Sequence, residues 1–139
     1  MVHALNEIRR VLVPNGILLD LRPILNNWPV EIVSGREAYE TGRIQGSPVG
    51  LADDEAANRS LTRAEQEGWL TREAEAFFLY YYSWDSPSEM EEWVAEEWQD
   101  FIQLDEESKR ATRSTWALGD ADSRVRIGVK MLITRWKKK

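Results

Sequence analysis

The sequence has 139 residues, of which 42% are hydrophobic and 30% are charged, a size and composition typical of one globular domain. Its 18 Lys and Arg residues are outnumbered by 24 Asp and Glu residues, and the net charge of -6 disfavours nucleic acid, which proteins hold by neutralising phosphates. The chain has no cysteine, which excludes disulfides and thiolate nucleophiles, and no apolar run approaches the roughly 20 residues that span a bilayer. We therefore expect a cytoplasmic protein that binds neither nucleic acid nor membranes.

The chain begins with a predicted helix and strand. Residues 2–12 place an apolar side chain at every third or fourth position, which predicts an amphipathic helix that ends at Pro14-Asn15-Gly16. Residues 17–21 are apolar with little alternation, which favours a strand covered on both faces, as in a parallel sheet. Arg22 is predicted to follow the end of this strand.

A more polar stretch comes next. Residues 29–34 and 36–44 are predicted to form a hairpin that turns at Ser34-Gly35. A flexible loop is predicted around three glycines spaced four residues apart: Gly42, Gly46 and Gly50.

Residues 52–68 are predicted to form a peripheral helix that ends at Gly68. Acidic side chains near its start suit the positive end of the helix dipole: Asp53, Asp54 and Glu55. Its apolar stripe is thin and consists of Ala57, Leu61 and Ala64.

The most apolar segment, residues 77–84, is rich in aromatic side chains and predicts a strand that is apolar on both faces. A helix is predicted to start directly after it, because Ser86 can cap the helix, Pro87 suits its first position and Glu89 can bond back to the cap. One stripe of this helix is predicted to be buried: Met90, Trp93, Val94, Trp98, Phe101 and Ile102.

The last elements are a helix over residues 105–118, capped by Asp105, and a long strand over residues 124–136 with one wet face. The apolar face of this strand is predicted to carry Val125, Ile127, Val129, Met131 and Ile133, and the wet face Arg124, Arg126, Lys130 and Thr134. The predicted organisation is one domain, residues 1–136, followed by a frayed basic tail, residues 137–139.

The first segment resembles a known family. It carries Leu5, Glu7, Arg10, Val11 and Leu12 on a helix, then Pro14 and Gly16 in a turn, then an apolar strand. This pattern resembles the segment of class I S-adenosylmethionine-dependent methyltransferases that leads into their fifth strand. Asn15 stands where the family has a first glycine, and asparagine also tolerates left-handed turns. The order of the later elements is similar to the family's last helix and its terminal antiparallel strand pair.

The resemblance implies an α/β or α+β domain, with a small mixed sheet and packed helices, similar to the C-terminal half of a Rossmann-like methyltransferase. In that family the first half of the fold holds the cofactor, by a glycine-rich turn that is absent here. We therefore expect no cofactor on the chain alone, and S-adenosylmethionine only where a partner completes the site. The strand over residues 17–21 would then have a bare edge, which predicts a homodimer or a complementary chain.

Candidate ligand-binding residues lie in two places. Arg22 follows the first strand, where open α/β sheets bind ligands, and its guanidinium can clamp a carboxylate or phosphate. A set of aromatic residues can stack on an aromatic or cationic small molecule, although packing in a core or interface explains the same side chains. The set consists of Trp28, Tyr80, Tyr82 and Trp84.

No residue is assigned to catalysis or to a metal. His3 has no nucleophile beside it and is predicted to lie at the surface. Two acidic groups lack the spacing of a calcium loop and suit a helix start and a turn: Asp53-Asp54-Glu55 and Asp120-x-Asp122. The glutamates between positions 89 and 97 and the basic row on the last strand are predicted to be solvated faces.

Two functions follow from these expectations. The first is a methyltransferase-like protein, truncated relative to its family and inactive alone, which acts on a small molecule if a partner chain supplies the cofactor half. The alternative is a non-catalytic, homo-oligomeric binding or interaction module, favoured by the surplus of tryptophan and tyrosine. A fragment of a split gene is a third interpretation.

Overall fold

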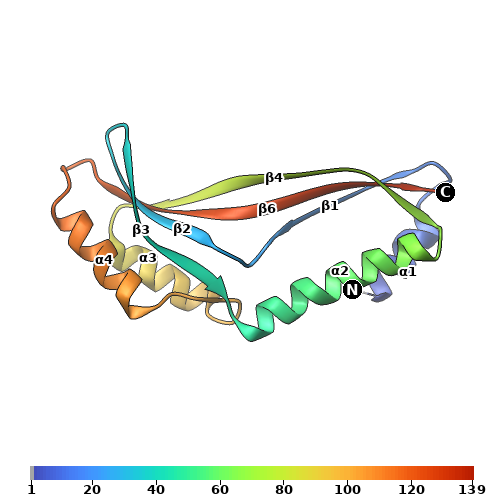
Figure 1. The fold of residues 1–139 in the computed structure, drawn as a ribbon, viewed down its shortest axis with the longest axis horizontal. Coiled ribbons are helices and arrows are strands. Elements are labelled where there is room, and N and C mark those ends of the chain that lie inside the picture. The colour runs from blue at the N-terminus through green and yellow to red at the C-terminus, as the bar shows by residue number, and fades with distance from the viewer. Residues whose placement is uncertain (1) are drawn as a thin grey trace. The chain divides into compact units, whose positions relative to one another are not determined.

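The computed structural model describes residues 2–139, which form four α-helices, a π-helical segment and a six-stranded antiparallel sheet (Figure 1). The α/β class is thus confirmed, whereas every strand pair with a described register is antiparallel, so the prediction of a mixed sheet is wrong. In chain order the elements are α1 (Val2–Val11), β1 (Ile17–Pro23), β2 (Trp28–Ser34), β3 (Glu37–Gly46), α2 (Pro48–Gln66), β4 (Leu70–Trp84), α3 (Pro87–Trp93), η1 (Val94–Trp98), β5 (Ile102–Gln103), α4 (Glu106–Ala117) and β6 (Arg124–Lys138).

The chain divides into two compact units. Unit 1 comprises Met1–Ile24, Ala52–Phe78 and Met131–Lys139, and unit 2 comprises Leu25–Leu51 and Leu79–Lys130. The prediction of one domain therefore stays a prediction, and each unit has its own buried residues.

In unit 1, β1 pairs antiparallel with the C-terminal part of β6, from Ile17 opposite Lys137 to Pro23 opposite Met131. One cluster of buried side chains joins the helices to the strands: Leu5, Leu61, Ala64, Trp69, Leu70 and Trp136. The predicted helices over residues 2–12 and 52–68 are both confirmed by α1 and α2. However, α2 begins earlier, at Pro48, so the acidic group at positions 53–55 lies beyond its first turn.

The predicted strand over residues 17–21 exists, but the prediction that both its faces are covered is wrong. Its exposure alternates: Ile17, Leu19 and Leu21 are 39%, 60% and 56% exposed, while Leu18 is half-buried against the core cluster. The helices of unit 1 thus cover only one face of β1, and the second apolar row is left in solvent.

The C-terminal lysines are ordered, so the prediction of a frayed tail is wrong. Lys137 pairs with Ile17, and the Lys138 amide donates to the carbonyl of Gly16 over 2.9 Å. The Lys138 ammonium also donates to the Arg9 carbonyl over 2.6 Å, at the C-terminal end of α1. A cation at this end satisfies carbonyl groups that the helix leaves unpaired.

In unit 2, the predicted hairpin is confirmed by β2 and β3, which turn at Gly35 with a positive φ of 59°. β2 also pairs antiparallel with the N-terminal part of β6, from Val30 opposite Ile127 to Val33 opposite Arg124. The buried apolar side chains of this unit include Val30, Ile32, Ile44, Met90, Val94, Ile102, Val125, Ile127 and Val129.

The spacing of the three glycines predicted a flexible loop, and this prediction is wrong. Gly42 and Gly46 belong to β3, and Gly50 belongs to the first turn of α2. A Cβ atom at Gly46 would lie 2.5 Å from the Leu25 carbonyl oxygen, and one at Gly50 would lie 2.5 Å from the Phe101 carbonyl oxygen. These positions need glycine because backbone approaches them closely.

The long strand over residues 124–136 is confirmed by β6, but its predicted faces hold only in unit 2. There Val125, Ile127 and Val129 are buried, whereas in unit 1 the buried positions become Leu132, Thr134 and Trp136. These three lie opposite Arg22, Asp20 and Leu18 of β1. Thr134, predicted on the wet face, is only 2% exposed.

Candidate functional site

All four aromatic candidates lie in unit 2 and come together in one cluster, which two further tryptophans complete. Tyr80 contacts Tyr82 with ring centroids 5.3 Å apart, and Trp28 contacts Trp98 edge-on at 5.5 Å. We call this group the aromatic cluster; its members are Trp28, Tyr80, Tyr82, Trp84, Trp93 and Trp98.

Three rings form the outer part of the aromatic cluster. The Tyr82 and Trp84 rings are nearly parallel, with centroids 6.2 Å apart and planes inclined by 17°. Trp93 lies 6.3 Å from Tyr82 and 6.4 Å from Trp84, so the three centroids form an almost equilateral triangle. Trp98 meets Tyr82 at right angles over 5.0 Å. Edge-to-face contacts of this kind are favoured because the positive ring edge meets the negative ring face.

The cluster runs from the interior to the surface of unit 2. Trp28 is 4% exposed, Tyr82, Trp84 and Trp98 are half-buried, and Trp93 is 39% exposed. The cluster is therefore neither a closed core nor a flat surface patch, and its outer rings are accessible to a ligand.

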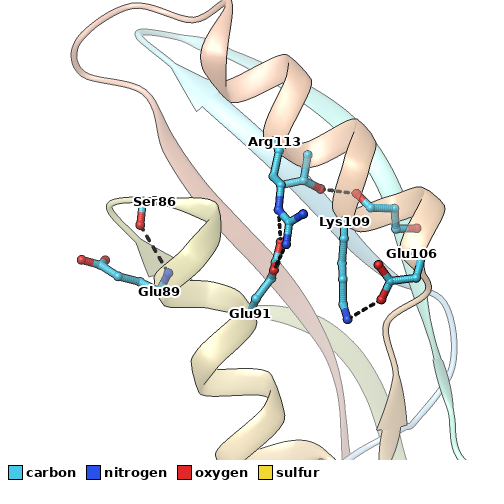
Figure 2. Close-up of polar contacts among 8 residues, drawn as sticks. Ser86, Glu89, Glu91, Glu106, Lys109 and Arg113 are labelled. Carbon is cyan, nitrogen blue, oxygen red and sulfur yellow. Dashed lines mark hydrogen bonds and ion pairs between the residues drawn. The ribbon is translucent and has the colours of Figure 1, made fainter.

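Local sequence explains how the rings are positioned. Side chains two residues apart on a strand share a face, which places Tyr80, Tyr82 and Trp84 of β4 in one row. α3 then starts at the predicted cap: Figure 2 shows the Ser86 hydroxyl accepting from the Glu89 amide over 3.3 Å. This cap fixes the first turn of the helix that carries Trp93 at its last position.

The predicted helix does not continue in α geometry. After Trp93 the chain forms the π-helical segment η1, and the next strand begins at Ile102. Met90, Val94 and Ile102 are buried as predicted, but Trp93 and Phe101 are 39% and 44% exposed. π-Helical turns are rare and often mark functional sites, because they rotate the following side chains away from the α-helical stripe.

Trp93 and Trp98 were not among the aromatic candidates, because their helical spacing indicated ordinary burial. The signal that distinguishes them is the charge around them. Residues 85–108 contain no Lys, Arg or His and ten acidic residues: Asp85, Glu89, Glu91, Glu92, Glu96, Glu97, Asp100, Asp105, Glu106 and Glu107.

Three of these acidic residues are paired with cations from other parts of unit 2 or from the next helix turn. Glu91 accepts from Arg113 of α4 over 2.8 Å, and Lys109 donates to Glu106 over 2.9 Å (Figure 2). The hydrogen bond from Lys109 lowers the pKa of Glu106, and the bond to Glu91 raises the pKa of Arg113. Asp85 pairs with Arg124 and likewise raises the pKa of that guanidinium.

Arg22 lies in unit 1, whereas the aromatic candidates belong to unit 2, and its guanidinium already has several hydrogen-bond partners. Its guanidinium donates to Asp20 over 3.1 Å, to the Asp54 carbonyl over 3.3 Å and to Asn58 over 2.5 Å. These bonds tie β1 to α2. β1 is also antiparallel to its neighbour, which removes the parallel-strand argument for a ligand at this position.

The remaining predictions concern His3, the acidic groups and the basic row on β6. His3 is exposed on α1, as predicted. Among residues 2–139, which the structure describes, no three His, Cys, Asp or Glu residues are grouped to hold a metal ion. The basic row on β6 is not simply solvated: Arg126 pairs with Glu31 over 2.5 Å and stacks 4.3 Å from the Tyr81 ring centroid.

The second notable surface is the open face of β1 in unit 1. β1 stands at the end of the strand order and pairs with β6 on one side. Its exposed row, Ile17, Leu19 and Leu21, lies opposite Lys137, Arg135 and Ile133 of β6. Adjacent exposed apolar side chains at the edge of a sheet are typical of a surface that another polypeptide covers.

No protein-family model, curated protein or solved structure matches the chain. Within residues 2–139 no helix is long and apolar enough to cross a membrane.

Proposed function

We propose that this chain is methyltransferase-like, and that unit 1 forms the part of such a fold that lies beside the cofactor site. In this proposal a cofactor-binding polypeptide pairs with the outer edge of β1, and transfer of a methyl group to a small molecule requires that partner. The proposal includes a cytoplasmic location, which suits a chain without cysteine.

The observation that carries the proposal is the exposed apolar row of β1. Leu19 and Leu21 are 60% and 56% exposed, although each buried leucine side chain contributes about 1.5–3 kcal/mol to stability. The row directly follows the segment from Leu5 to Gly16 that resembles the methyltransferase family. β1 also stands at the end of the strand order, so its outer edge has no neighbour in the described sheet. A partner that pairs with this edge and packs over the exposed row would cover both.

The order of elements in unit 1 supports the same proposal. α1 and β1 are followed later in the chain by α2, β4 and β6, with elements of unit 2 inserted between them. β6 pairs with both β1 and β4. This order is similar to the family's last helix and its terminal antiparallel strand pair.

The proposal assigns the S-adenosylmethionine site to the partner polypeptide and not to this chain. The family's glycine-rich turn has no counterpart, because Gly42, Gly46 and Gly50 lie in β3 and α2, where close backbone contacts require them. We therefore derive no chemical step on this chain, and we expect it not to bind the cofactor unaided.

Calorimetry tests this proposal. The chain is titrated with S-adenosylmethionine alone and after mixing with a polypeptide that carries the glycine-rich turn and the first four strands of a class I methyltransferase. We expect the chain alone to bind S-adenosylmethionine no more tightly than about 1 mM, and the mixture to show saturable binding at about 0.1 mM or tighter. Leu19→Glu should abolish the tighter binding of the mixture, whereas Leu118→Glu, at a position that is 89% exposed in unit 2, should not. Binding tighter than about 0.1 mM by the chain alone, or equal effects of the two variants, would contradict the proposal.

A second candidate, a non-catalytic homo-oligomeric module, is favoured by β4. Five consecutive residues of this strand, Phe77–Tyr81, are each 43–55% exposed. If β4 pairs with its copy, light scattering at micromolar concentration gives twice the monomer mass, and Tyr80→Lys returns the monomer. A monomeric wild-type chain excludes this candidate and leaves the first one intact.

A further inference from the structure

We propose that Tyr82, Trp84 and Trp93 bind a small organic cation of the quaternary or methylated ammonium class. The inference goes beyond the proposed function and does not depend on it, because all three residues lie in unit 2 and need no cofactor.

The geometry of the three rings supports this ligand. Their centroids are 6.2, 6.3 and 6.4 Å apart. The centre of this triangle is about 3.6 Å from every centroid. A cation about 3.5 Å above that centre lies about 5 Å from every centroid, inside the limit of about 6 Å for a cation–π contact. Proteins recognise quaternary ammonium groups by several aromatic rings that contact the same cation.

Two further tryptophans of the aromatic cluster pack against these rings. Trp98 packs edge-on against Tyr82 at 5.0 Å and against Trp84 at 6.3 Å, and Trp28 in turn supports Trp98 at 5.5 Å. Because Trp28 is buried, this support belongs to the interior of unit 2. Preorganised rings lose little conformational freedom on binding, which favours affinity for a small ligand.

Cation–π contacts within the chain involve other aromatic rings and leave these three available to a ligand cation. Elsewhere in the chain arginines lie over aromatic rings: Arg9 over Trp69, Arg72 over Trp136 and Arg126 over Tyr81. Within residues 2–139, no Lys or Arg is found over the three proposed rings.

The acidic residues next to Trp93 add a negative potential to these open ring faces. Glu92 adjoins Trp93 in the sequence, and Glu96 and Glu97 follow within about one helical turn. Among the described residues these three glutamates form no ion pair, in contrast to Glu91, which pairs with Arg113. Carboxylates without a counterion around exposed aromatic faces attract a diffuse organic cation.

The test uses choline as the probe and its uncharged isostere 3,3-dimethylbutan-1-ol as the control, at matched ionic strength. The full chain, without S-adenosylmethionine, is titrated while NMR records the indole N–H signals of its seven tryptophans. We expect saturable shifts of the Trp84 and Trp93 signals with a dissociation constant of about 1–10 mM, and no saturation with the isostere.

Variants locate the site. Trp93→Leu should weaken choline binding about fivefold or more, as expected for the loss of one cation–π contact. Trp84→Leu should act in the same direction, and Trp116→Leu, which removes a tryptophan of α4 outside the aromatic cluster, should leave the affinity unchanged. Circular dichroism verifies that each variant is folded.

Three results would overturn the inference: no saturable shift with choline, equal affinity for the neutral isostere, or equal losses in the Trp93 and Trp116 variants. None of them bears on the methyltransferase proposal, which is measured with a different ligand and with Leu19→Glu and Leu118→Glu, outside the three rings.

Discussion

Replacement of Gly46 by alanine is expected to destabilise unit 2, although glycine-to-alanine changes often stabilise a protein. The added Cβ would lie 2.5 Å from the Leu25 carbonyl oxygen and 2.8 Å from the Leu51 Cδ2 atom. The side chain of Leu51 can move, but the backbone carbonyl at position 25 cannot move without a shift of the chain.

Overpacking of this kind costs about 1–3 kcal/mol, and the lower entropy of the unfolded alanine chain offsets about 0.4–1 kcal/mol of that cost. The free energy of unfolding should therefore fall by about 1–2 kcal/mol. Urea unfolding followed by circular dichroism measures the change. Gly35→Asn is the matched control, because the space around Gly35 is open and asparagine tolerates its φ of 59°. If Gly46→Ala is within about 0.5 kcal/mol of wild type, the close approach deduced for β3 is wrong.

Three further substitutions test individual contacts. Ser86→Ala should lower the free energy of unfolding by about 1 kcal/mol, because the α3 cap is lost. The control Ser114→Ala, at an exposed position of α4, should change that free energy little, and equal effects of the two variants would refute the cap. Thr112→Val should cost about 1–2 kcal/mol, because the buried hydroxyl of Thr112 lies 2.7 Å from the hydroxyl of half-buried Thr41. An unchanged urea midpoint would contradict this. The Ser108 amide holds the pKa of Asp105 below its ordinary value of 3.8, so the stabilisation is present above that value and is lost as the pH falls through the lower, folded-state pKa. Asp105→Asn should therefore flatten the acid limb of stability against pH, and an unaltered limb would contradict the assignment.

Helix ends and caps that depend on residues close in the sequence were predicted correctly. Pro14-Asn15-Gly16 ends α1, Ser86 caps α3 and Asp105 caps α4, because each of these effects depends on neighbours along the chain. The start of α2 carries the same kind of signal: Ser47 precedes Pro48, and its hydroxyl accepts from the Gly50 amide over 3.1 Å. This Ser-Pro pair is the sequence feature that marks the start of α2.

Features set by distant residues were not predicted. Gly46 and Gly50 are required by Leu25 and Phe101, which no local pattern reveals. The apolar sequence of β1 does not indicate whether other residues of the chain cover its second face. The change of buried positions along β6, which buries Thr134, likewise depends on how β1 and the helices of unit 1 meet it.

The candidate site was predicted in part for the same reason. The β4 rings share a face by strand alternation, so their convergence follows from the sequence. Trp28, Trp93 and Trp98 join them only through the tertiary packing of unit 2.

The central claim is that the outer edge of β1 receives a strand from a cofactor-binding polypeptide. Hydrogen exchange on β1, measured for the chain alone and for its mixture with the glycine-rich half of a class I methyltransferase, tests this most directly. We predict that the β1 amides between Ile17 and Leu21 become protected in the mixture, whereas exchange along β3 stays the same. Unchanged exchange on β1 in a mixture that binds S-adenosylmethionine would contradict the claim.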